Sequence, residues 1–124
     1  MAGLAALLSA LSLGLGLARD PYVGVACSQP NSTVCGRVGI AVWVARRHAI
    51  RVDATLAGAH VRLVPPKQVG SFWVGFVHLP LQRMGLRQSW AGDPQKELTL
   101  RLHIRYASGW RTGNVRLLLH AGWG

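Results

Sequence analysis

Carboxylates are what this chain most lacks. Its 124 residues hold four Asp and Glu against fourteen Lys and Arg, which gives a formal net charge of +10 at pH 7. The acids are Asp20, Asp53, Asp93 and Glu97, and only the last two are close in the sequence. General acid–base catalysis usually needs paired carboxylates or a histidine that one of them orients. We therefore expect that this protein is not an enzyme.

Motifs for nucleophiles, bound phosphates and metals are also missing. No Gly-x-Ser-x-Gly, His-Glu-x-x-His or Gly-x-x-x-x-Gly-Lys pattern occurs. None of the histidines stands at a metal-ligand spacing from another; they are His48, His60, His78, His103 and His120. We expect no catalytic residue, no metal site and no cofactor.

One long apolar run is present, at the start of the chain. Residues 2–18 (AGLAALLSALSLGLGLA) are uncharged, and their small-x-small end would place signal-peptide cleavage before Arg19. As a membrane anchor, the run would span roughly 25 Å at about 1.5 Å per residue, the short limit for a bilayer core. Residues 1–18 are therefore expected to form a signal peptide or a membrane anchor. A start codon assigned too late and a buried core helix remain open as alternatives.

The only two cysteines, Cys27 and Cys35, follow this run closely. Seven residues separate them, too many for a zinc knuckle, and no second pair completes four ligands. Two free thiols are the alternative to a disulfide, which forms in oxidising compartments. We therefore expect residues 19–37 to form an extracytoplasmic linker with a Cys27–Cys35 loop. The protein would then be secreted or membrane-anchored, with its domain outside the cytoplasm.

The rest of the chain, residues 38–124, reads as a β domain. Residues 98–106 alternate apolar and polar side chains with period two, typical of a strand with one buried face. Residues 108–114 are turn-rich and 115–120 alternate again, which predicts a hairpin with a long loop.

Further strands are expected upstream. Residues 50–56 and 61–63 predict a second hairpin, whereas 38–44 and 72–79 are continuously apolar and predict strands buried on both faces. The predicted fold is all-β: an antiparallel immunoglobulin-like sandwich or a small barrel, preceded by one apolar N-terminal helix.

The period-two pattern gathers cations on one side of a strand. A candidate anion-binding face consists of Arg101, His103, Arg105 and Arg116. A second basic cluster is expected at a strand connection and consists of Arg46, Arg47 and Arg51. Such surfaces attract polyanions, and Trp110, expected at a hairpin tip, adds a ring for stacking. A solvated face that keeps a small domain soluble is the alternative interpretation.

Two segments carry a resemblance to a known group. Residues 35–43 (CGRVGIAVW) and 122–124 (GWG) resemble uncharacterised membrane-anchored or exported proteins of actinobacteria that are associated with sigma/anti-sigma systems. The resemblance covers about half of the chain after residue 18 and includes no functional motif. It implies an envelope location and a sensory or accessory role.

Two functions are therefore expected. The first is a non-enzymatic extracytoplasmic binding or sensory module of the cell envelope. Its partner would be an anionic envelope polymer, a lipid headgroup or an envelope protein, and residues 2–18 would hold it to the membrane if they are not cleaved. The alternative is a basic nucleic-acid-binding β-barrel with a miscalled N-terminus; nucleic acid is the less expected partner.

We predict a disulfide between Cys27 and Cys35 in protein taken from its native compartment. Closing this short loop should stabilise the fold by about 2–3 kcal/mol in the chain-entropy model. Intact mass spectrometry without reductant should give a mass lower by two hydrogens than that of the reduced protein. Two alkylatable thiols would contradict both the bond and the export that it implies.

Overall fold

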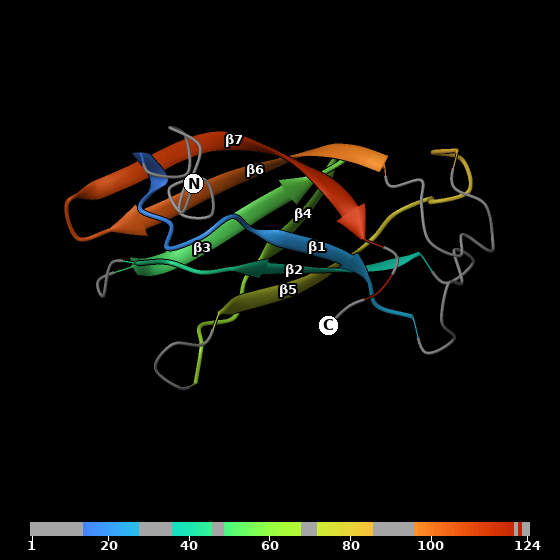
Figure 1. Cartoon of the computed structure of the whole chain (residues 1–124). Coiled ribbons are helices and arrows are strands. Elements are labelled where there is room, and N and C mark those ends of the chain that lie inside the picture. The colour runs from blue at the N-terminus through green and yellow to red at the C-terminus, as the bar shows by residue number, and fades with distance from the viewer. Residues whose placement is uncertain are drawn as a thin grey trace, which may run out of the picture.

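Seven strands form one sheet in the computed structural model, which describes residues 14–27, 36–45, 49–67, 72–85, 96–120 and 122 (Figure 1). The strands are β1 (Tyr22–Val25), β2 (Arg37–Val42), β3 (Ala49–Leu56), β4 (Ala59–Arg62), β5 (Trp73–His78), β6 (Lys96–Tyr106) and β7 (Gly109–His120). Their order is β4-β3-β6-β7-β1-β2-β5. The all-β prediction is confirmed. The sheet is mixed, however, because β1 and β7 pair in parallel.

The two edge strands approach each other and nearly close the sheet into a barrel. Just beyond β4, Val64 exchanges backbone hydrogen bonds of 2.7 and 3.1 Å with Val74 of β5. Nearby, a Cβ at Gly75 would lie 2.6 Å from a Leu63 methyl and 3.2 Å from a Val61 methyl. Glycine at this position therefore lets both side chains pack across the seam. Of the two predicted architectures, the structure is closer to the barrel than to the sandwich.

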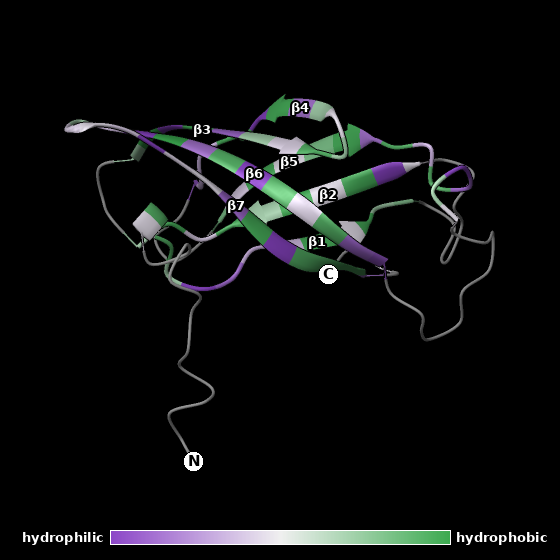
Figure 2. Ribbon diagram, turned by 90° about the horizontal axis from the view of Figure 1, so that it is seen from above, coloured by the Kyte–Doolittle hydropathy of each residue, from purple (hydrophilic) through white to green (hydrophobic). Residues whose placement is uncertain are grey.

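Alternate side chains of the strands fill the barrel interior. On β6, Leu100, Leu102 and Ile104 are buried whereas Arg101 and Arg105 are exposed, as the alternation predicted. The same alternation is visible as green and purple bands along β6 and β7 in Figure 2. Strand β2 is buried on both faces from residue 38 to 42, as predicted. Strand β5 is not: its burial alternates, so the prediction of a doubly buried strand was wrong there.

The loop predicted at residues 108–114 is mostly strand. A two-residue turn at Ala107 and Ser108 joins β6 to β7, and residues 109–114 pair with β6. The prediction was wrong because Gly109, Gly113 and Asn114 read as turn residues. Gly113 instead makes room for the N-terminal segment, since a Cβ there would lie 3.3 Å from the Leu15 side chain.

The end of the apolar N-terminal run is built into the barrel. Leu15 and Leu17 are 2% and 3% exposed and belong to the core. Ala18 donates a backbone hydrogen bond to the Trp43 carbonyl, and the Tyr106 hydroxyl donates to the Leu15 carbonyl at 2.5 Å. Residues 14–18 are thus held against the barrel by main-chain and side-chain contacts, including an isolated β-bridge between Leu17 and Val44.

The predicted N-terminal helix is not supported. The described residues contribute no helical element to the fold, and residues 1–13 lie outside them. No helix in the described ranges is both long enough and apolar enough to cross a membrane.

The segment predicted as a linker, residues 19–37, contributes to the sheet. It contains all of β1, which hydrogen-bonds to both β2 and β7, and the first residue of β2. Val23 and Val25 of β1 are buried in the core. Cys27 packs partly buried against that core. Its expected partner Cys35 lies outside the described residues, so the disulfide stays a prediction.

We predict that Leu17→Ala lowers the free energy of unfolding by about 2–5 kcal/mol, because it leaves a cavity in the core. Leu118→Ala is the control, since Leu118 is 46% exposed and its truncation should change stability by no more than about 0.5 kcal/mol. Urea denaturation of the full chain measures both values. Equally small effects would show that residues 14–18 do not form part of the folded core.

Candidate anion-binding face

The outer side of the wall formed by β4, β3, β6 and β7 carries most of the charged side chains described on strands. We call this surface the basic face and define it by Arg51, Arg62, Arg101, His103, Arg105, Trp110 and Arg116. The strand register sets its rows: His103 lies between Asp53 and Thr112, and Arg105 lies between Arg51 and Trp110. The four predicted anion-binding residues are therefore on one surface. The second predicted cluster contributes Arg51 to it, whereas Arg46 and Arg47 lie outside the described residues.

Arg101, Arg105 and Arg116 form a line along the outer face of β6 and β7, whereas Arg111 of β7 pairs with the buried Ile104 and lies on the inner face. Arg101 and Arg105 are four residues apart on β6, or about 13 Å at about 3.3 Å per residue. Arg116 lies opposite Thr99, which makes it a diagonal neighbour of Arg101 at roughly 7–8 Å. Arg105 and Arg116 are consequently at opposite ends of the line.

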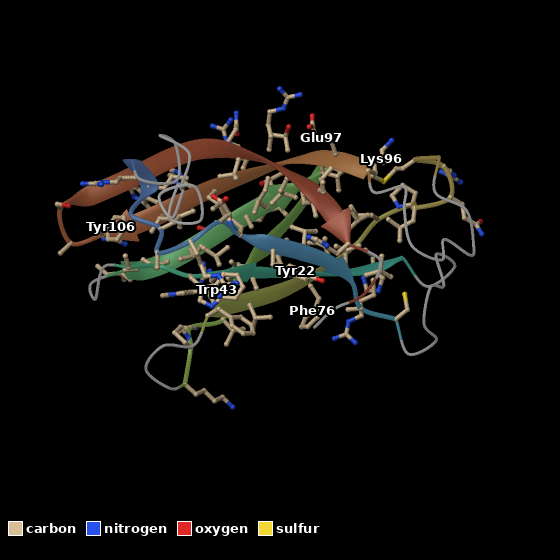
Figure 3. The ribbon with its side chains drawn as sticks, viewed as in Figure 1. Tyr22, Trp43, Phe76, Lys96, Glu97 and Tyr106 are labelled. Atoms are coloured by element: carbon tan, nitrogen blue, oxygen red, sulfur yellow. The ribbon has the colours of Figure 1, made fainter. Side chains whose placement is uncertain are left out.

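The arginines of this line differ in their partners. Arg116 pairs with Glu97 at 2.5 Å, and Figure 3 shows Glu97 on the outer side of the wall. Both side chains are exposed, so the pair contributes about 0–1 kcal/mol. In the described part of the chain, no carboxylate lies within ion-pair distance of Arg101 or Arg105. These two guanidinium groups are the ones available to an external anion.

Asp53 is a buried carboxylate beneath the basic face. It is 5% exposed, and Arg51 Nε donates a hydrogen bond to its Oδ2 at 2.8 Å. His60 Nε2 and Arg62 Nε each lie 3.9 Å from Oδ1, which accepts no hydrogen bond from the described residues. Asp53 therefore fixes the position of Arg51 and offsets part of the positive charge at this end of β3 and β4.

An aromatic stack stands beside Arg105. The rings of His103 and Trp110 are 4.0 Å apart between centroids and 14° from parallel. The guanidinium carbons of Arg51 and Arg105 lie 6.0 and 5.9 Å from the Trp110 ring, within cation–π distance. His103 Nδ1 is also hydrogen-bonded to the Thr112 hydroxyl. Trp110, expected at a hairpin tip, is the second residue of β7 and 44% exposed.

A second stack lies at the junction of β1 and β7. The rings of Tyr22 and His120 are 4.4 Å apart and 11° from parallel. The Tyr22 hydroxyl donates to the Gly122 carbonyl at 2.5 Å, and burial raises the pKa of Tyr22 above its usual value of 10.0. A Cβ at Gly24 would lie 2.4 Å from that carbonyl oxygen. These contacts hold Gly122 against β1, so this stack serves the fold.

The described residues hold no group of three or more His, Cys, Asp or Glu side chains close enough to bind a metal ion. Comparisons with protein-family models, curated proteins and solved structures find no match to this chain. The functional assignment therefore depends on the geometry of the basic face.

We predict that Arg51→Gln destabilises the protein by about 1–3 kcal/mol, because the buried Asp53 carboxylate loses its close donor. Arg62→Gln should cost no more than about 1 kcal/mol, since that contact is long and exposed. Combining Arg51→Gln with Asp53→Asn should recover part of the loss by removing the unpaired charge. Chemical denaturation measures all three. Equal effects of the two single arginine variants would contradict this description of the Asp53 site.

Proposed function

We propose that this protein is a non-enzymatic binding module whose basic face holds anionic polymers. The observation that carries the proposal is the exposure of Arg101 and Arg105 on an open sheet surface, with no carboxylate from the described chain in reach. The guanidinium group presents a planar set of donors that suits phosphate and carboxylate. An external anion is the natural partner of these two side chains.

The spacing of the cations favours a polymer over a small anion. Arg105 and Arg101 are about 13 Å apart along β6, too far for one phosphate or carboxylate to contact both. A chain with repeated charges, laid along β6, engages both and then approaches Arg116. The net charge of +10 adds a long-range attraction for such a chain.

We propose that the protein resides in the cell envelope, outside the cytoplasm. The apolar run at residues 2–18 and the cysteine pair support this location. The burial of Leu15 and Leu17 favours retention of the run's last residues over a cut before Arg19. Cleavage at that bond would remove two core leucines.

A test of the binding surface uses inorganic polyphosphate and the double variant Arg101→Gln/Arg105→Gln. We predict at least about a tenfold loss of affinity, since each charged hydrogen bond contributes about 1.5–3 kcal/mol. Wild-type binding should weaken roughly tenfold between about 50 and 200 mM salt, as for two or three neutralised charges. Isothermal titration calorimetry measures both.

The matched control is Arg37→Gln/Arg83→Gln, which removes the same charge elsewhere. Arg37 lies on β2 in the opposite wall, and Arg83 is exposed in the turn after β5. The control should retain affinity within about twofold, a change below the 1.4 kcal/mol that a tenfold difference represents. Equal losses in the two double variants would show that net charge, and not the basic face, determines binding.

A further inference from the structure

We infer that the polymer held by the basic face is a single-stranded nucleic acid, with a base stacked on Trp110. This inference rests on the proposed function and names its ligand. It follows from the presence of an exposed, fixed aromatic ring beside two guanidinium groups at one end of the line of arginines.

The Trp110 ring is held in place before any ligand arrives. His103 lies parallel to it at 4.0 Å, and the bond between His103 and Thr112 restrains the imidazole in turn. Trp110 nevertheless leaves 44% of its surface exposed, the most of any tryptophan described. A planar ligand can extend the stack, and little side-chain freedom is lost because the indole is already ordered.

The charges around the ring define what the ligand must carry. Guanidinium carbons of Arg51 and Arg105 lie 6.0 and 5.9 Å from the ring centre, and Asp53 holds Arg51 in position at 2.8 Å. A ligand that satisfies this site has a planar ring with an anionic group close to it. A nucleotide unit has both, because its base stacks on aromatic side chains and its phosphate pairs with arginine.

Other polyanions supply only part of this chemistry. Polyphosphate, anionic polysaccharides and lipid headgroups carry charge but no planar aromatic ring. A nucleic-acid duplex carries bases, but their faces are stacked inside the helix and are not free to reach Trp110. A single strand presents its bases and lets its backbone continue along β6 from Arg105 to Arg101. The geometry of the Trp110 site therefore favours a single-stranded nucleic acid over the envelope polymers as the ligand.

The experiment measures fluorescence anisotropy of a labelled oligothymidylate of about twelve nucleotides, within the site sizes of small nucleic-acid-binding barrels, on the full chain. Competitors are the same sequence as a duplex, polyphosphate of equal charge, and heparin as an anionic polysaccharide. We expect the single strand to bind tightest. Trp110→Ala should weaken its binding by roughly 5- to 150-fold, the range for loss of one stacked base.

Matched variants separate stacking from folding. Trp110→Phe keeps an aromatic face and should restore most of the affinity, whereas Leu118→Ala removes an exposed apolar side chain from the same strand and should change nothing. Trp110→Ala should leave the affinity for polyphosphate within about twofold of wild type, because polyphosphate has no ring that could stack on Trp110. An unchanged affinity for polyphosphate also shows that the variant is folded.

The outcomes distinguish this inference from the proposed function. If all polyanions bind and Trp110→Ala affects none of them, the basic face binds charge alone and the inference is overturned while the proposed function stands. Duplex binding as tight as the single strand, or heparin binding that depends on Trp110, would also overturn it. If no polyanion binds the wild-type chain, both fail.

Discussion

Closure of the sheet is the constraint on which the rest of the structure depends. The edge strands meet at the backbone bonds between Val64 and Val74, and Gly75 leaves room for the Val61 and Leu63 side chains that cover the seam. A nearly closed barrel of seven strands has an interior that side chains fill. Charged groups have no place in such an interior unless they are paired, because burying a lone charge is costly. Arg101, Arg105 and Arg116 therefore lie outside, and they collect on one surface because β6 and β7 pair over their whole length.

The long amphipathic strands could be predicted from the sequence, whereas elements that depend on distant contacts could not. β6 keeps its alternation over 11 residues, which determines both its conformation and its buried face. β1 has only four residues, one of them Gly24, so it is too short for an alternation of buried and exposed side chains to be recognised in the sequence. Residues 109–114 contain turn-favouring glycines, yet they pair with β6, and Gly113 leaves room for Leu15 of the N-terminal segment. Burial of Leu15 depends on that contact and on the Tyr106 hydroxyl, 91 residues away in the chain.

The candidate site likewise has a part that the sequence predicts and a part that depends on contacts between distant strands. The outward direction of Arg101 and Arg105 follows from the alternation of β6 alone. The placement of Arg51 and Trp110 beside Arg105 requires the register of three strands, which pairs Arg51 with Arg105 and Arg105 with Trp110. No pattern in a single sequence specifies that register. The Asp53–Arg51 contact and the His103–Trp110 stack consequently emerge only in the folded structure, and they distinguish an ordered binding surface from a merely solvated one.

Binding at the basic face is tested most directly by mapping chemical shifts of the isotope-labelled protein during titration with oligothymidylate. Amide signals of Arg101, Arg105 and their β3 and β7 neighbours should move together with the Trp110 indole N–H. Signals from β1, β2 and β5 should stay in place, because those strands form the opposite wall (Figure 1). Shifts centred on that opposite wall, or spread evenly over the surface, would contradict the assignment of the basic face as the binding site.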